Sequence, residues 1–433
     1  MEDIIDKIAC SFDQYEVFYL NEKGNKIEAR DGEICSAEYK EEEGYALRAI
    51  KESRPVFCYA YDRNDPAGKL IANAQALIPA MEIDEDMVFT GSYNDSDYPT
   101  AKLLDESGLA LPDGEKRSIL LEMEEAIRKY DSRIKAVRNC EFQEVEVTAS
   151  IRNSYGLDAT GRSSLFVCSA MAVAGEGSDE VSWYDWRWAH NLGGVDAKKM
   201  GTDIAGKVIS MLNARQIPTG TYDGIFTPRS AADLLGILSE SFLGESLFKD
   251  KTQLKRKEGE RCFADVLTII DSGMAGADAF MFDGEGVPSC DNIIVEDGVF
   301  RTFLYDAYFG RKLGKSSTGN SVRSSLKSPP KCGPRGMYVQ PGSRDILPAM
   351  GRGVIIEELM GTHTANVITG DFSVGCLGYV IENGVRIPFQ GVMISGNVFE
   401  VFKNIKETGN DLTFYGSVGS PSLYVEGLKI SGT

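Results

Sequence analysis

The stretch FQEVEVTASIRNSYGLDATGRSSLFVCSAMAVAGEG, residues 142–177, indicates the fold class of the N-terminal half. Two strand-like runs lie on either side of a turn at Tyr155-Gly156-Leu157, and a third run, VSWYDWRWAHNL, follows at residues 181–192. Runs rich in β-branched and aromatic residues, with turn residues between them, are typical of antiparallel strands. The sequence therefore predicts an antiparallel sheet in this half.

Residues 15–62 have a related pattern. Apolar and polar residues alternate in four runs, as half-buried antiparallel strands require. The runs are YEVFYLN (15–21), NKIEAR (25–30), EGYALRAI (43–50) and PVFCYAYD (55–62). Their positions predict turns at Glu22-Lys23-Gly24 and at Glu52–Pro55.

Helices are predicted between these strands and after them. They fall at residues 63–83, after Pro66, at residues 112–130, and after Asp196, whose side chain suits an N-cap. The 45 glycines of the chain favour turns, and hence β-structure. The expected fold class is α+β, with an N-terminal domain of antiparallel sheet and helices.

The second half is predicted to be a β-rich domain with one motif-bearing helix. From Ala264 onward, short apolar runs are separated by Gly, Asn, Asp and Pro, except in a long irregular segment at residues 316–345. The pairs suited to tight hairpins are Asp297-Gly298, Asn383-Gly384 and Glu426-Gly427.

The chain length predicts two domains. A chain of 433 residues exceeds the roughly 250–300 residues at which a single core stops growing. A linker at Gln216–Thr221 separates the two patterns, so we place the domains at residues 1–215 and 216–433.

The formal net charge of −19 argues against a direct nucleic-acid partner, because phosphate binding relies on clustered Lys and Arg. One basic cluster nevertheless lies in and beside the irregular segment: Lys315, Arg323, Lys327, Lys331, Arg335 and Arg344. We interpret it as a solvated loop. A cover over a cleft and a site for acidic peptide are the alternatives.

The sequence also predicts a location for the protein. The N-terminal MEDIIDKIACSFDQYE is acidic, unlike a signal peptide, and no apolar run approaches the ~20 residues that cross a bilayer. Nine cysteines are scattered singly, without a CxxC pair. We expect a cytoplasmic protein with reduced thiols and no association with membranes.

The segment Ser230–Asp250, SAADLLGILSESFLGESLFKD, is predicted as a helix. It has the shape of a metalloprotease helix without its ligands, since a zinc hydrolase needs closely spaced imidazoles and a carboxylate. Glu240 is available, but the nearby positions hold Ser239 and Gly244. The chain has only two histidines, His190 and His363, so local His-x-x-His chemistry is excluded.

Three blocks of the second half carry a family resemblance. They are IPTGTYDGIFTPRSAADLL (217–235), FDGEGVPSCDNIIVEDGVFRTFLYDAYFGRKLGKSSTGN (282–320) and GDFSVGCLGYVIENGVRIPFQGVMISGNVFEVFKNIKETGNDL (370–412). In these blocks, and more loosely through EGYALRAI and ARQIPTG in the first half, the chain resembles the TldD/PmbA family. Its members are peptidase subunits once described as modulators of DNA gyrase.

The resemblance has direct implications for the site. TldD-type subunits carry an HExxxH zinc motif on this helix and a C-terminal cysteine as third ligand, whereas PmbA-type (TldE) subunits lack both. The motif positions fall on Ser239, Glu240 and Gly244, and no cysteine follows Gly409–Leu412. The resemblance thus implies a PmbA/TldE-like chain with no catalytic residue, metal or cofactor of its own.

The same resemblance implies a role and partners. We expect a non-catalytic subunit of a cytoplasmic assembly that processes or degrades unfolded peptides, inactive alone, with zinc only in a TldD-type partner. A homodimer is the alternative to that mixed pair. Two further functions remain open: an autonomous peptidase with a non-standard site, and a homodimeric peptide-binding protein.

A non-standard site would draw on the few reactive side chains outside the motif. His363 is a candidate ligand beside Glu240 or Cys376, and Cys376 with His363 is a candidate nucleophile and base. The simpler interpretations are a polar loop histidine and a buried, inert thiol.

The three tryptophans of the chain, Trp183, Trp186 and Trp188, lie within six residues of one another. Trp186 and Trp188 would share one face of a strand, because side chains two residues apart point the same way. Such an aromatic face suits an interface or an extended-peptide groove. Ordinary packing between the domains is the alternative interpretation.

Overall fold

A computed structural model describes residues 2–433 of the chain. Its helices are α1 Glu2–Ala9, α2 Pro66–Leu77, α3 Glu106–Leu109, α4 Asp113–Arg128, α5 Ala197–Ser210, α6 Pro228–Ser239, α7 Gly244–Phe248, α8 Ala307–Lys312 and α9 Val398–Lys403. The strands of the first half are β1 Gln14–Arg30, β2 Glu33–Lys51, β3 Arg54–Ala60, β4 Ile134–Asn153, β5 Asp158–Glu176 and β6 Asp179–Ala189.

The strands of the second half are shorter and more numerous. They are β7 Gly220–Phe226, β8 Ile269–Ser272, β9 Asp291–Glu296, β10 Val299–Phe300, β11 Ser321–Val322, β12 Lys331–Cys332, β13 Met337–Val339, β14 Gly353–Met360, β15 Asp371–Glu382, β16 Val385–Asn397, β17 Ile405–Thr408, β18 Thr413–Tyr415, β19 Val418–Ser420 and β20 Leu423–Ser431. The predicted α+β class is confirmed.

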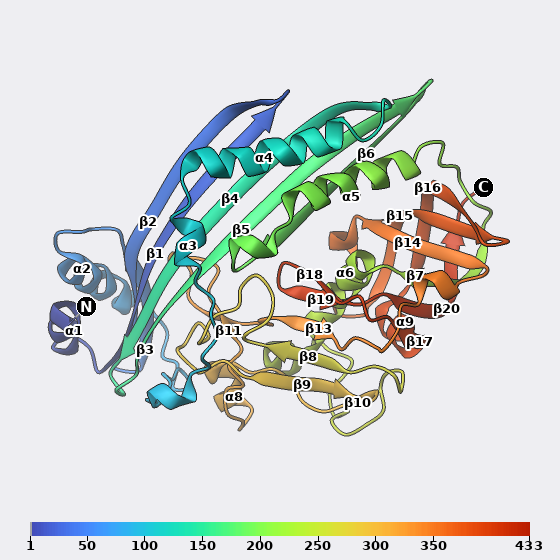
Figure 1. Cartoon of the computed structure of the whole chain (residues 1–433). Coiled ribbons are helices and arrows are strands. Elements are labelled where there is room, and N and C mark those ends of the chain that lie inside the picture. Colours follow the sequence, from blue (N-terminus) through green and yellow to red (C-terminus); the bar gives the residue numbers. More distant parts are fainter. Residues whose placement is uncertain (1) are drawn as a thin grey trace.

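The first half is one antiparallel sheet in the order β3-β2-β1-β4-β5-β6. Its long central strands run diagonally across the molecule, with α4 and α5 side by side on one face (Figure 1). The two helices bury Leu120, Met123, Ile204 and Val208 against the sheet, so their apolar stripes form one core with it. Asp196 caps α5 as predicted, accepting a hydrogen bond from the Lys199 amide at 2.8 Å.

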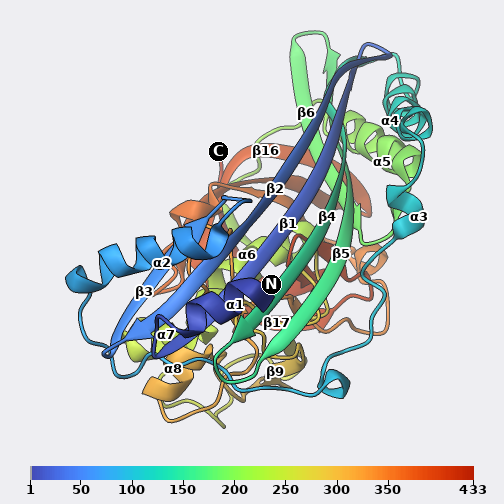
Figure 2. The same cartoon turned by 90° about the vertical axis from the view of Figure 1, so that its left-hand side faces the viewer.

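The helices α1 and α2 pack at the other end of the same sheet, beside β3 (Figure 2). The predicted helix after Pro66 is α2, whose N-cap is Asp65. No helix among residues 2–433 has the length and apolarity needed to cross a membrane.

The second half contains two six-stranded sheets, in the orders β10-β9-β8-β13-β19-β18 and β16-β15-β14-β7-β20-β17. Helix α6 lies between them and contacts β14 and β7 on one side and β19, β18 and β13 on the other (Figure 1). Because it is enclosed by both sheets, α6 is buried on most of its surface, and Leu234, Leu235 and Leu238 are fully buried.

Two predicted turns are wrong. The turn at Glu22-Lys23-Gly24 does not exist, because β1 runs straight through and pairs with β2 and β4 on both sides there. Glu426-Gly427 is an irregularity inside β20, where the register shifts between Val425 and Leu428. Gly427 has φ +80°, a conformation that favours glycine, and its amide donates to Asp223.

Candidate functional site

The motif segment is a broken helix, so the predicted continuous helix Ser230–Asp250 is wrong. Helix α6 ends at Ser239, a 3₁₀ turn covers Glu240–Phe242, and α7 begins at Gly244. Leu243 between them is extended (φ −85°, ψ 138°) and forms a β-bridge with Leu304. Backbone pairing with this neighbouring segment outweighs the local helical preference.

The three motif positions do not fit zinc. The Ser239 hydroxyl donates back to the Gly236 carbonyl at 2.7 Å. Gly244 has no side chain, and a Cβ placed there would lie 2.4 Å from Cδ1 of the Tyr305 ring. Since Tyr305 already fills the space that a ligand side chain would need, no imidazole fits at this position without rearrangement.

Glu240 is the one motif residue with a carboxylate. It is exposed, and it forms no ion pair among the residues that the structure describes. Neighbouring protein atoms remove part of the water around its carboxylate, and this loss of hydration, followed by the negative charge of the nearby Glu245, raises its pKa. A single carboxylate in this position lacks the other ligands that hold a zinc ion.

Replacing Gly244 by alanine is expected to destabilise the protein by about 1–3 kcal/mol, because the added methyl group meets the Tyr305 ring and the Leu304 carbonyl. The matched control is Gly236→Ala in α6, where the added Cβ has open space and alanine is the better helix former. Chemical denaturation measures both. Equal effects of the two substitutions would contradict the assigned clash.

The other candidate residues do not form a site with Glu240. His363 is exposed in a 3₁₀ turn at Thr362–Thr364, whereas Cys376 is fully buried in β15. Burial raises the pKa of the Cys376 thiol to about 12, so it is not a thiolate at neutral pH. Within residues 2–433, no three His, Cys, Asp or Glu side chains are arranged to hold a metal ion.

The tryptophans divide between the two faces of β6. Trp183 is buried against the helices, where Arg229 and Lys207 approach its ring at 5.4 and 5.7 Å. Trp186 and Trp188 are half-buried on the opposite face. The Trp188 indole donates to the Phe414 carbonyl at 3.3 Å, so this face contacts the β18–β19 hairpin of the second half. A role for it in binding peptide or a partner remains a prediction.

The basic cluster is only partly solvated, and the predicted solvated loop is wrong for two of its members. Lys315, Lys327, Lys331 and Arg344 are exposed. The Arg335 side chain is buried and faces four backbone carbonyls, those of Gly273, Gly319, Phe280 and Phe282. The Arg323 guanidinium is buried beside Glu16 of β1.

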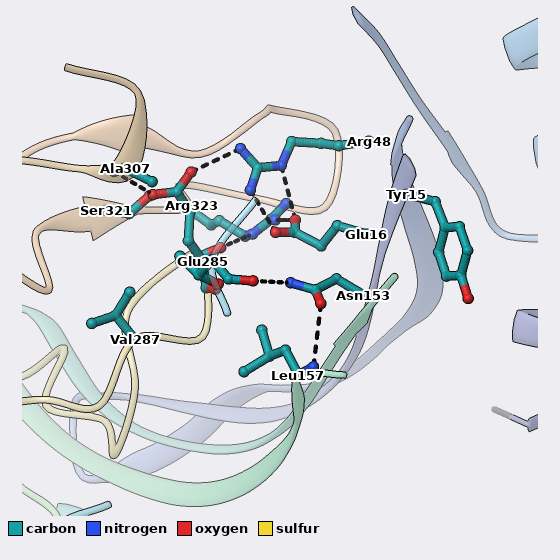
Figure 3. A network of polar contacts seen from close by, with 12 residues as sticks. Tyr15, Glu16, Arg48, Asn153, Leu157, Glu285, Val287, Ala307, Ser321 and Arg323 are labelled. Atoms are coloured by element: carbon teal, nitrogen blue, oxygen red, sulfur yellow. Dashed lines mark hydrogen bonds and ion pairs between the residues drawn. The ribbon is translucent and has the colours of Figure 1, made fainter. Parts of the chain in front are cut away.

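The buried charges form one network that joins the two halves (Figure 3). Arg48 of β2 pairs with Glu16 through two hydrogen bonds, of 2.9 and 2.5 Å, and with Glu285 through one of 2.9 Å. Arg323 completes the network by pairing with Glu16. Two guanidinium groups and two carboxylates thus balance one another away from water.

Backbone contacts fix the same loop in place. The second Glu285 oxygen accepts from the Ala307 amide at 2.9 Å, and the Thr90 hydroxyl donates to the Glu285 carbonyl at 2.7 Å. The phenyl ring of Phe89 lies 5.2 Å from the Arg48 guanidinium. Sequence reasoning missed this network because its members are far apart in the chain. Arg48 within the otherwise apolar run Ala46–Ile50 was the available signal.

A cavity of about 380 Å³ lies beside this network, between the two halves. Its apolar wall comes from β3, the segment after α2, and α8, and includes Val56, Phe57, Met81, Met87, Phe89 and Phe309. Its polar groups are Arg48, Glu245, Glu285, Asp306, Tyr308 and Lys331. Glu245 follows Gly244 directly, so the end of the motif segment forms part of the wall.

Asp306 is the most perturbed acid in this wall. Burial, and then the Glu285 carboxylate, raises its pKa to about 7. One of its oxygens, Oδ1, caps α8 by accepting from the Phe309 amide at 2.7 Å. The cavity thus contains a carboxyl group whose charge changes near neutral pH.

The motif segment has the form of a metallopeptidase helix in which Ser239 and Gly244 stand at two positions that would need ligand side chains. Three family models match almost the whole chain: PmbA/TldA metallopeptidase domain 1 at residues 15–78, the central domain at residues 106–212 and the C-terminal domain at residues 219–432. The chain belongs to the PmbA/TldD family of metallopeptidases.

Individual relatives agree with this assignment. Metalloprotease PmbA of Escherichia coli O157:H7 is 26% identical over 97% of this chain and 92% of its own length. An uncharacterized protein of Methanocaldococcus jannaschii is 33% identical over 64% of this chain and 66% of its own length. Of the solved structures, TldE of Thermococcus kodakarensis superposes with a TM-score of 0.92 at 23% identity, covering both chains fully. This likeness shows the shared fold.

Proposed function

We propose that this chain is a PmbA/TldE-like, non-catalytic subunit of a cytoplasmic metallopeptidase assembly that processes or degrades unfolded peptides. One observation carries the proposal: Tyr305 and the Leu304 carbonyl occupy the space around Gly244, where the zinc motif of the TldD-type subunits would place a histidine. The Ser239 hydroxyl, bonded to its own helix, adds no ligand.

In this proposal, a TldD-type partner holds the zinc ion and performs the hydrolysis. A zinc-bound water and a general base suffice for peptide hydrolysis, and both would belong to the partner. This chain would shape the space in which an extended peptide meets the partner's site. Main-chain pairing with a strand edge would give binding with little sequence preference.

The test is proteolysis of unfolded, fluorescently labelled casein by this chain alone, by a TldD-type partner alone and by the two mixed. We expect chelator-sensitive cleavage in the mixture and none by this chain, which should also purify without stoichiometric zinc. Glu240→Gln in this chain should leave the activity of the mixture unchanged, whereas the same change in the partner's HExxxH motif should abolish it.

Two results would overturn the proposal. The first is chelator-sensitive cleavage by this chain alone, which would show an autonomous peptidase. The second is a purified homodimer that binds the casein without turnover and does not associate with the partner during gel filtration. That result would favour a homodimeric peptide-binding protein.

A further inference from the structure

The cavity between the two halves has the composition of a ligand site. A volume of about 380 Å³ is within the ~300–1,000 Å³ typical of small-molecule sites. Most of its wall is apolar, and two of the wall residues are methionines, Met81 and Met87, whose unbranched side chains adapt to different shapes. Such a wall suits a hydrocarbon side chain.

The polar groups determine what head group the cavity accepts. The Arg48 charge is already neutralised by Glu16 and Glu285, so an anionic ligand gains little from it. Lys331 is exposed, so water and salt screen its charge. Neither cation favours a carboxylate or phosphate group as the main anchor.

Asp306 is different because its carboxyl group has no ion-pair partner within residues 2–433. Arg48, whose charge opposes the rise in the pKa of this carboxyl, pairs with Glu16 and Glu285 instead. Asp306 is only 5% exposed and lines the cavity, yet its carboxyl group forms no ion pair among the described residues. Its Oδ1 atom caps α8, and its Oδ2 atom accepts no hydrogen bond from residues 2–433. A buried carboxyl with a free oxygen beside an apolar wall is matched by an ammonium group on an apolar chain.

We propose that this cavity binds an unblocked amino group attached to an apolar side chain, the chemistry of a peptide N-terminus that begins with a residue such as leucine. Asp306 accepts a hydrogen bond from the ammonium group, and Met87 and its apolar neighbours contact the side chain. The choice of a peptide as the source rests on the proposed function. The ligand chemistry rests on the cavity alone.

The proposal requires binding to depend on pH. Because burial raises the pKa of Asp306 to about 7, binding should weaken below that pH as the carboxyl becomes protonated. It should also weaken above pH ~8, where an α-amino group loses its proton. Of the neighbouring groups, Arg48 and Glu285 are paired, and the pKa values of Tyr308 and Cys332 are raised away from this range. Burial, and then Glu285, also raises the pKa of Asp283, whose charge acts on Asp306 but which lies outside the cavity wall. Glu245 is paired with Lys249, and Lys331 is exposed.

The experiment is calorimetric titration of the full chain, without a partner, using four probes: leucinamide, N-acetyl-leucinamide, alaninamide and the peptide Leu-Ala-Ala-Ala. We expect leucinamide to bind, with a maximum affinity between pH 7 and 8. N-acetyl-leucinamide should not bind, and alaninamide should bind about tenfold or more weakly. Tighter binding of the tetrapeptide than of leucinamide would identify a peptide as the source, and equal binding would identify a small amine.

Two Asp→Asn substitutions, each at the N-cap of a helix, distinguish a loss of ligand binding from a general effect on folding. Asp306→Asn keeps the shape and the cap of α8 but removes the charge, and should weaken leucinamide binding about tenfold or more. Asp196→Asn changes the cap of α5 in the same way, outside the cavity wall, and should bind normally.

Three outcomes would overturn the proposal: no binding by the folded wild-type chain, equal binding of the acetylated probe, or equal affinity in both variants. All three measurements use this chain alone, so their failure leaves the casein test of the assembly intact. A failed casein test, in turn, does not affect leucinamide binding.

Discussion

Arg48→Met is expected to lower the free energy of unfolding by about 3–5 kcal/mol, the cost of leaving a buried charge unpaired. The side chains of Arg48, Glu16 and Glu285 are 8%, 0% and 2% exposed. Removing the guanidinium leaves two carboxylates with Arg323 as the remaining cation, so the network has an uncompensated negative charge. Chemical denaturation at pH 7 measures the loss.

A surface pair provides the matched control. Arg152→Met breaks an ion pair with Asp158, whose side chain is 54% exposed, and should cost less than about 1 kcal/mol. Adding Glu16→Gln to Arg48→Met should recover part of the lost stability, because the charges of the network balance again. Additive losses in the double variant, or equal losses at positions 48 and 152, would contradict the assigned network.

The stability of the protein is expected to decrease as the pH rises from about 5 to 8. A carboxyl whose pKa is higher in the folded than in the unfolded protein contributes stability below the unfolded pKa of about 4. That contribution is lost as the pH rises through the folded pKa, which is about 7 for Asp306 and about 6 for Asp233. Burial raises the pKa of Asp283 in the same direction, so this carboxyl adds to the decrease. For Asp306 alone, the loss is up to about 4 kcal/mol between pH 4 and pH 8, of which about 3 kcal/mol falls between pH 5 and pH 8.

Asp306→Asn tests this assignment through a change in the slope of stability against pH. The variant carries no titrating group at this position, so its stability relative to the wild type should rise by about 3 kcal/mol between pH 5 and pH 8. Urea denaturation at pH 5, 6, 7 and 8 measures the profile, with Asp196→Asn as the control that keeps the wild-type slope. Parallel profiles for Asp306→Asn and the wild type would show that Asp306 does not titrate in this range.

Local patterns predicted the elements whose geometry depends on nearby residues. The helix after Pro66, the cap at Asp196 and the turns at Asp297-Gly298 and Asn383-Gly384 follow from backbone preferences within a few residues. The predicted turn at Gly24 failed because β2 and β4 supply ladder hydrogen bonds on both sides of β1. A pattern read from one segment does not contain these partners.

The candidate site was likewise predictable only where residue type alone decides the outcome. The motif positions identified Ser239, Glu240 and Gly244 as lacking zinc ligands, which requires only the residue types. The basic residues of the irregular segment were interpreted together, although Arg323 and Arg335 are buried and the others are exposed. Their different environments depend on Glu16 and on backbone carbonyls from other parts of the chain.

By itself, the sequence determined the fold class, the family and the missing zinc ligands, because each depends on residue type and short-range order. Only the tertiary structure decided that α6 ends at Ser239, that Tyr305 fills the space beside Gly244, and that Asp306 lines a cavity without an ion pair to any described residue. These features depend on contacts between segments far apart in the chain, where burial and neighbouring charges set the energy of each group.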